Sequence, residues 1–355
     1  MAETAQPAAP SPAAPPAPPP GRWHGDGLIA RSVRFTLTVM APVGLGLIIG
    51  NDVWLIYALV ICILATALDT GGTARQRLAA MAVGGVVVLL GTGLGTLVAG
   101  HMVLTMLAFA LVGVVYALVE SLHQSVAISA RFACLTLAIG ALYAPLQSVD
   151  AVAVGVFIIY AWVVSITWDL VVGVWRPCTA PSLWRLLLRL RATKRERWVF
   201  AGAVAITIPA AFFTSTALGL HRPYWALLAV VLVLREDSLA SRELMGQTML
   251  GTVLGVALSL GIGWLFPSTG AVLAAMMVAA LVRWPAQQYH GALGNAALTV
   301  FIMLLLEFIN GGVAGAAHDM IARLIDMAVG CAFALIALMI DRLAQRVFAP
   351  RPGAV

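Results

Sequence analysis

The sequence predicts an all-α membrane protein, a polytopic bundle of transmembrane helices. Of its 355 residues, 61% are apolar and only 10% are charged, whereas soluble domains carry about 25% charged residues. The mean hydropathy is +0.98. Apolar runs recur at the length of about 20 residues that a helix needs to cross a bilayer. These observations exclude a soluble enzyme, a disordered regulator and a secreted disulfide scaffold, and a β-barrel would show alternating strands instead.

The two ends of the chain are expected to lie outside the membrane bundle. Residues 1–30 begin with MAETAQPAAPSPAAPPAPPPG, and this density of proline predicts a disordered Ala/Pro-rich tail because proline cannot continue a helix. The tail has no basic start and no apolar core, so it is not a signal peptide. Residues 343–355 are predicted to form a short basic tail. We expect no soluble domain at either end.

About twelve membrane segments are predicted, six on each side of a polar break. The apolar runs lie near 33–50, 53–68, 78–100, 102–119, 125–144 and 151–175, and then near 198–220, 223–235, 244–266, 268–282, 291–309 and 320–341. The run PYWALLAVVLVL (223–234) would cover only about 18 Å as a helix. It is either a half-helix or a helix that continues past Arg235 into an aqueous cavity, and such short segments mark transport sites in many carriers.

The polar stretch between the two sets of apolar runs predicts how the protein is oriented in the membrane. It forms a basic linker over residues 176–197, with its cations at Arg176, Arg185, Arg189, Arg191, Lys194, Arg195 and Arg197. Cations concentrate on the cytoplasmic side of membrane proteins, so both termini are predicted to be cytoplasmic as well. This topology explains the net charge of +6 without a nucleic-acid partner. The stretch SLWRLLLRLRATKRERW is predicted to lie on the membrane surface as a basic amphipathic helix.

The two halves of the chain resemble each other, which predicts two six-segment parallel repeats over 31–175 and 198–342. A shift of 167 residues superposes His123 on His290, and with four extra residues in the first half Trp54 falls on Trp225. The same shift pairs Arg75 with Arg242 and Gly84 with Gly251. Chance agreement between apolar segments is the alternative. Parallel repeats are common in transporters, whose pathway runs between the halves.

The second half resembles a known family. The motifs are RPYW (222–225) at the entry to a short helix, GTVLG (251–255) in the next helix, and ARLIDMAVG (322–330) in the last one. Together they resemble the fusaric acid resistance / aromatic acid exporter family over most of 198–342. The resemblance implies a minimal form without the large cytoplasmic domain that longer members carry.

The resemblance implies a secondary-active efflux transporter of weak organic acids, aromatic ones among them, in the bacterial inner membrane. It implies proton coupling and a small organic anion as the partner, with no cofactor. Plant aluminium-activated malate channels are similar to this family, so an organic-anion channel is an alternative. A non-transporting membrane scaffold, whose basic linker recruits anionic lipid or a protein, is a third interpretation. A homo-oligomer is compatible with each of them.

Four residues are predicted to bind the substrate anion. Arg131 lies about two turns inside its apolar run, and a fixed guanidinium can hold a carboxylate through two hydrogen bonds. An arginine that reaches to the interface is the alternative. Arg323 lies in the last run. Arg222 precedes Trp225 by three residues, which places a cation beside an aromatic platform. Tryptophan also gathers at membrane interfaces without binding anything.

Four further residues are predicted to couple protons. His123 and His290 begin the fifth segment of each half, and histidine titrates near neutral pH. Asp326 lies one turn from Arg323, either as its structural partner or as a protonatable carboxylate. Asp169 lies near the end of the sixth run. The histidines can equally be ordinary interfacial residues.

The sequence holds no sign of enzymatic or metal chemistry. It has no Walker A motif, no H-E-x-x-H and no G-x-S-x-G. Its four cysteines form no C-x-x-C pair, and three lie in apolar runs, as small core residues do. We therefore predict neither catalysis, nor a cofactor, nor a metal.

Overall fold

The structure is a computed structural model. It describes residues 27–348 except 51–53, 174–176, 179–181, 193–194, 221–222, 236–237 and 310–312, and it leaves out the side chains of 183, 238, 313–321, 346 and 348. The predicted N-terminal tail therefore lies almost wholly outside the described residues.

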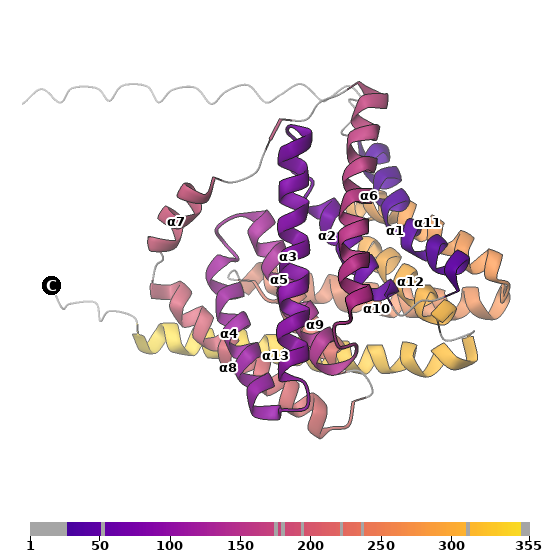
Figure 1. The fold of residues 1–355 in the computed structure, drawn as a ribbon. Coiled ribbons are helices and arrows are strands. Elements are labelled where there is room, and N and C mark those ends of the chain that lie inside the picture. Colours follow the sequence, from indigo (N-terminus) through magenta and orange to yellow (C-terminus); the bar gives the residue numbers. More distant parts are fainter. Residues whose placement is uncertain are drawn as a thin grey trace, which may run out of the picture.

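Within the described residues every regular element is an α-helix. The helices are α1 (Leu28–Ile49), α2 (Leu55–Ala67), α3 (Ala74–Val98), α4 (Met102–Val119), α5 (Gln124–Leu142), α6 (Ser148–Val172), α7 (Leu183–Arg191), α8 (Arg195–Ala217), α9 (Tyr224–Val233), α10 (Ser238–Leu265), α11 (Thr269–Tyr289), α12 (Gly291–Ile309) and α13 (Val313–Phe348). Figure 1 shows α3 and α6 upright, with the last helix, α13, lying across the lower part of the molecule.

The predicted fold class, an all-helical polytopic membrane protein, is confirmed. Ten of the described helices are long and apolar enough to cross a membrane. Each predicted apolar run overlaps one helix, and α7 is the amphipathic helix expected in the basic linker. Two helices are short: α2 has 13 residues and α9 has 10. At 1.5 Å per residue they extend over about 20 and 15 Å, less than the roughly 30 Å of a hydrocarbon core.

The packing of the helices is compatible with the predicted repeat. The contacts α1·α2, α2·α3, α2·α6, α3·α5, α3·α6 and α4·α5 have the counterparts α8·α9, α9·α10, α9·α13, α10·α12, α10·α13 and α11·α12. Contacts between the halves also correspond, because α1 packs on α11 and α8 packs on α4. In each half, the fourth membrane segment therefore packs against the first helix of the other half.

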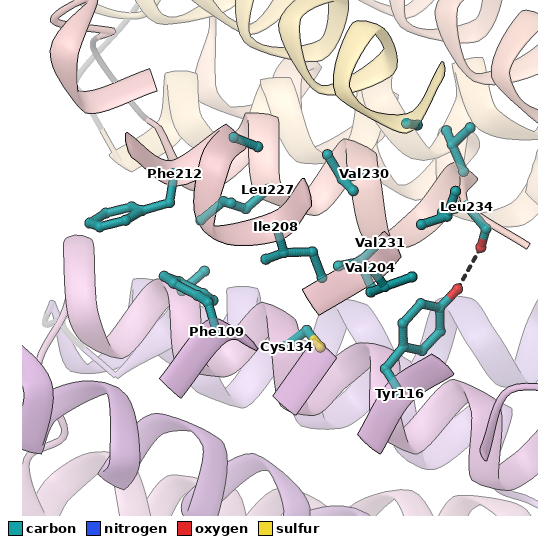
Figure 2. Packing of buried hydrophobic residues seen from close by; sticks show 14 of the residues in the cluster. Phe109, Tyr116, Cys134, Val204, Ile208, Phe212, Leu227, Val230, Val231 and Leu234 are labelled. Carbon is teal, nitrogen blue, oxygen red and sulfur yellow. Dashed lines mark hydrogen bonds between the residues drawn. The ribbon is translucent and has the colours of Figure 1, made fainter. Parts of the chain in front are cut away.

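The core between the halves is built on α9. Phe109 and Tyr116 from α4 and Cys134 from α5 face Ile208 of α8 and Val231 of α9 in one buried cluster (Figure 2). The Tyr116 hydroxyl donates a hydrogen bond to the Leu234 carbonyl at the end of α9. A short helix that is apolar on all sides can be stable only inside such a core, and eight of the ten residues of α9 are buried.

Glycines allow the long helices to approach each other closely. A Cβ on Gly251 of α10 would lie 2.6 Å from the Cβ of Asn295 on α12, and one on Gly255 would lie 2.5 Å from the Cβ of Thr299. Gly91 of α3 meets the Ala133 carbonyl of α5 in the same way, at 2.8 Å. Gly84, the repeat partner of Gly251 in the sequence, packs instead against Leu68, 2.7 Å away, at the end of α2.

Two boundaries differ from the sequence expectation. Arg75 and Arg77 precede the predicted third segment, which starts near residue 78, but both belong to α3, which begins at Ala74 behind a Thr73 cap. Arg77 is fully buried there. The helix α13 runs to Phe348, so it includes the first residues of the predicted basic tail.

Candidate functional site

The two short helices carry a tryptophan at corresponding ends, and the surroundings of the two rings differ. Trp54 precedes α2 and stacks on Phe157 of α6, with the ring centroids 5.8 Å apart and the planes at 18°. Trp225, the second residue of α9, lies under the guanidinium of Arg323 from α13, whose Cζ is 3.9 Å from the ring centroid. The first half therefore has an apolar stack where the second half has a cation–π contact.

Arg323 is an enclosed cation. It is 4% exposed, and its Nε and Nη1 atoms have no hydrogen-bond partner. It makes no ion pair with any described carboxylate, although Asp326 lies one turn further along the same helix and is also buried. A buried charge without a partner costs free energy and is a mark of function inside a membrane. Arg323, the predicted cation of the last segment, therefore lies inside the bundle, and its Nε and Nη1 donors are available to an anion.

Two tyrosines extend the aromatic surface next to this cation. Tyr224, the first residue of α9, lies 5.1 Å from Trp225 and 5.2 Å from Tyr143, measured between ring centroids. Tyr143 ends α5. The following residue, Ala144, accepts a hydrogen bond from Tyr57 of α2 through its carbonyl. The connection between α5 and α6 therefore touches both short helices at their N-terminal ends.

The arrangement at the N-terminus of α9 suits an aromatic anion. Arg323 supplies a positive charge, and the free N–H groups at a helix N-terminus add a partial positive charge. Tyr143, Tyr224 and Trp225 supply aromatic surface. Transporter sites are often built at the ends of short helices in this way.

A closed ring of charges lies at the other end of α2. Arg34 of α1 pairs with Asp69 at 3.2 Å and with Asp169 at 3.8 Å. Arg77 pairs with Asp169 and, at 3.7 Å, with Asp69. The Ser165 hydroxyl donates to Asp69 at 2.6 Å and accepts from Arg77 at 2.9 Å. The two arginines and two aspartates balance each other in charge. Because they come from different elements, their ion pairs join α1, α3 and α6 to the connection after α2.

The corresponding end of α9 has an unbalanced cluster. Arg131 of α5 pairs with Glu120 at 3.0 Å, and Arg235, which follows α9, lies 3.7 Å from the same carboxylate. Two cations therefore share one anion. Arg131 is about two turns inside α5, as the sequence indicates, but it is engaged by Glu120.

The paired histidines have the same local role. The Nδ1 atom of His123 accepts the Ser125 N–H before α5, and that of His290 accepts the Ala292 N–H before α12, each at 3.2 Å. Both act as helix caps, since a side-chain acceptor satisfies one of the free N–H groups at a helix start. Their correspondence is the one that the sequence repeat predicts.

The structure brings together some of the predicted site residues and separates others. Trp225 and Arg323 are in contact at the N-terminal end of α9, and Asp326 is one turn away. Arg131 lies at the C-terminal end of that helix and Asp169 in the ring beside α2. Arg222 lies outside the described residues.

Sequence reasoning missed several residues. Tyr143, Glu120 and the ring members Arg34, Asp69 and Arg77 carry much of the geometry but stand out in no motif. One signal was present: Asp69 is an acidic residue between two apolar runs whose flanking charges are otherwise basic. A carboxylate at this position indicates an ion pair with a nearby arginine, whereas the basic residues around it would otherwise be read only as signals of membrane orientation.

Two pockets occupy corresponding places at the C-terminal ends of the short helices. One, of about 370 Å³, lies among α1, the end of α2, α6 and the end of α11. The other, of about 810 Å³, lies among α4, α8, the end of α9, α10 and α13. Arg323 lines neither of these two pockets and is itself buried, whereas Tyr143 at the edge of the aromatic cluster is exposed.

Comparison with known proteins finds similarity to two bacterial membrane proteins. The chain is similar to the inner membrane protein YccS of Escherichia coli (strain K12), with 25% identity over 120 residues, which are 34% of this chain and 16% of that protein. It is also similar to the uncharacterized membrane protein YvaC of Bacillus subtilis (strain 168), with 32% identity over 173 residues, 46% of this chain and 26% of that protein.

These matches cover about a quarter or less of the relatives' length. No solved structure matches the chain. The resemblance seen in the sequence is confirmed by the family comparison: residues 209–337, which include Trp225, Arg323 and Asp326, match the fusaric acid resistance protein-like family.

Proposed function

We propose that this chain is a secondary-active exporter of weak organic anions, with aromatic carboxylates as its preferred substrates. It acts in the bacterial inner membrane with both termini in the cytoplasm. The observation that carries the proposal is the buried guanidinium of Arg323 over Trp225, beside Tyr224 and Tyr143. The family match supports it, because residues 209–337 contain this cluster apart from Tyr143.

The substrate carboxylate accepts hydrogen bonds from Nε and Nη1 of Arg323, the two atoms without a partner. Charge-assisted bonds of this kind are the strong ones. The aromatic ring of the substrate packs against the tyrosine and tryptophan rings. Because Arg323 is 4% exposed, the anion reaches it only when the bundle opens. A site that must open favours alternating access over an open channel.

Asp326 is the first candidate for proton coupling. It lies one turn from Arg323 on α13 and is 1% exposed. Its charge opposes anion binding at Arg323, and protonation removes that charge. His123, His290 and Asp169 remain candidates at the other end of the bundle. Arg131 and Arg222 are the further candidate anion contacts.

Deletion of the gene, followed by growth on a panel of aromatic acids at acidic and neutral pH, tests the proposal. The deletion strain should become sensitive, and wild-type protein should restore growth while Arg323→Gln should not. Arg242→Gln, which changes an exposed arginine on α10, is the control and should restore growth. Unchanged sensitivity to every acid, with expression confirmed in the parent strain, would rule out this function.

Reconstituted protein separates the transporter from the channel. Flux of an aromatic acid into liposomes should follow an imposed pH gradient and saturate with substrate. Currents that follow voltage alone and ignore the pH gradient would identify an anion channel instead.

A further inference from the structure

The ion pairs at the C-terminal end of α9 connect the two halves of the chain. Glu120, at the end of α4, and Arg131 of α5 belong to the first half, whereas Arg235 follows α9 in the second half. The Glu120 carboxylate lies 3.0 Å from Nη2 of Arg131 and 3.7 Å from Nε of Arg235. We call these three residues the Glu120 cluster. Their side chains are between 11% and 21% exposed, so the cluster is largely shielded from water.

A hydrogen bond beside the cluster joins the same two places. The hydroxyl of Tyr116, one turn before Glu120 on α4, donates to the Leu234 carbonyl at the end of α9 (Figure 2). Nη1 of Arg235 donates to the same carbonyl at 2.9 Å. The end of α9 is therefore held to the end of α4 by an ion pair and by a hydrogen bond from a fully buried tyrosine.

The Glu120 cluster lies beside a wide pocket. The pocket has a volume of about 810 Å³, and Glu120 and Arg235 form part of its wall. The exposed residues Glu196 and Glu243 also line it. Tyr116 and Leu234, next to the cluster, belong to the buried apolar core between the halves. The cluster therefore lies between the pocket and the core that surrounds α9.

The pocket lies on the side of the bundle that the basic linker occupies. Nη1 of Arg189, on the linker helix α7, donates to the Leu122 carbonyl at 2.7 Å, two residues after Glu120. The cations of the linker are those that predict the cytoplasmic side. The contact between Arg323 and Trp225 lies at the opposite end of α9, a helix of ten residues that extends over about 15 Å.

The charged ring beside α2 differs from the Glu120 cluster because all its members belong to the first half. They come from α1, the connection after α2, α3 and α6, and are Arg34, Asp69, Arg77 and Asp169. A movement of one half relative to the other leaves this ring intact, but it separates Arg235 from Glu120. A partly exposed ion pair is weak enough to form and break reversibly.

We propose that the Glu120 cluster is the gate of the substrate path on the linker side. The gate is closed while Arg235 lies on Glu120. When the end of α9 moves away from α4, both this ion pair and the hydrogen bond from Tyr116 break, and the pocket extends along α9 toward Arg323. Arg131 holds the Glu120 carboxylate while the gate is open. The inference rests on the proposed function for what passes the gate, whereas its closure can be measured without a substrate.

Alkylation of native cysteines in the full chain tests the gate. Cys134 of α5 is 4% exposed and lies in the core behind the cluster, and Cys62 of α2 is fully buried in the core around α2. The exposed Cys178 is replaced by serine throughout. The protein in liposomes is treated with N-ethylmaleimide, and the modified peptides are followed by mass spectrometry.

Glu120→Gln and Arg235→Gln should each raise the alkylation rate of Cys134 about tenfold, because the population of a minor open state rises when the closed state loses a contact. The rate at Cys62 should not change. Glu243→Gln removes an exposed carboxylate from the wall of the same pocket, so it is the matched control and should leave both rates unchanged. The double variant Glu120→Arg, Arg235→Glu keeps the charges of the cluster and should restore the slow rate at Cys134.

Two results would overturn the proposal. One is an unchanged rate at Cys134 in either folded single variant. The other is an equal rise at Cys134 and Cys62, which would show that the cluster stabilises the whole fold instead of closing a path. If Glu120→Gln does not fold, Arg235→Gln provides the same test.

Flux of an aromatic acid into the same liposomes separates this proposal from the transport proposal. A faster reaction of Cys134 in the variants, with no flux through the wild type, would reject the proposed substrate and support the gate. Flux through the wild type, with an unchanged rate at Cys134 in the variants, would reject the gate alone.

Discussion

The two short helices, α2 and α9, occupy corresponding places in the two halves but have different surroundings. At the N-terminal end, Trp54 stacks on a phenylalanine, whereas Trp225 lies under a buried arginine. At the C-terminal end, α2 is followed by a neutral ring of two arginines and two aspartates, whereas α9 is followed by two arginines on one glutamate. Next to α2, each of the two arginines pairs with both aspartates, whereas next to α9 two arginines share one glutamate and Arg323 pairs with no described carboxylate.

This difference indicates that the two halves have different roles. Satisfied networks hold a structure in place, and unsatisfied buried charges are retained where a ligand completes them. The half around α2 is therefore expected to act as the support. The half around α9, which is also the half that matches the known family, is expected to hold the substrate.

The largest effect on stability is expected from breaking the ring beside α2. Arg77→Met leaves Asp169 buried without its closest partner, and such a loss costs about 3–5 kcal/mol. The variant should unfold at a much lower temperature in detergent than the wild type. Arg75→Met, on the exposed side of the same helix turn, is the matched control. Equal melting temperatures for Arg77→Met and the wild type would show that the ring does not stabilise the fold.

The glycine contact of α10 with α12 should be the next most sensitive place. Gly255→Ala puts a methyl group against Thr299 and the Ala296 carbonyl, and overpacking of this kind costs about 1–3 kcal/mol. Gly202→Ala on α8, where a Cβ meets no atom within 4 Å, should leave the melting temperature within a degree or two. If the two variants have the same melting temperature, the close approach of α10 and α12 does not contribute to the stability of the second half.

Substitution of each of the two tryptophans by phenylalanine should affect transport differently in the two halves. Trp225→Phe weakens the ring under Arg323, a contact worth about 1 kcal/mol or more when buried, and should raise the KM for an aromatic acid several-fold. Trp54→Phe keeps an aromatic stack on Phe157 and should leave the KM unchanged. The measurement is initial uptake rate against substrate concentration in liposomes. A larger change of KM in Trp54→Phe would reverse the assignment of the two halves.

The smallest effect is expected at the histidine caps. Asparagine can cap a helix as histidine Nδ1 does but does not titrate, so His123→Asn should keep the stability, while His123→Ala should lose about 1 kcal/mol. Transport against pH in the double variant His123→Asn, His290→Asn then separates capping from coupling. An unaltered pH profile leaves Asp326 and Asp169 as the coupling candidates, and a flattened one assigns the coupling to the histidines.

Much of the fold follows from the sequence, because apolar runs long enough to cross a membrane form α-helices, which satisfy their own backbone hydrogen bonds. The short run at 223–234, the amphipathic linker helix and the position of Arg131 inside its segment were all predictable. The equivalence of His123 and His290 was predictable from the repeat. These features depend on local composition and spacing, which the sequence displays directly.

The candidate site was only partly predictable, because its members come from distant segments. Arg323 and Trp225 are nearly a hundred residues apart, and Tyr143 belongs to the other half. In the sequence, Arg77 looks like one of the basic residues that set the membrane orientation, yet in the structure it is fully buried and pairs with Asp169. Gly84 and Gly251 align but pack on different helices. Sequence alone cannot show which neighbours a polar side chain meets in the bundle.

Flux of an aromatic carboxylate through purified protein in liposomes, compared between Arg323→Gln and Arg242→Gln, tests the central claim most directly. Arg323→Gln should lower the saturable uptake at least tenfold, because it removes a charge-assisted pair of hydrogen bonds to the substrate, and its melting temperature should be nearly unchanged. Arg242→Gln should transport as the wild type does. Wild-type flux through folded Arg323→Gln would contradict the assignment of the substrate site to the N-terminus of α9.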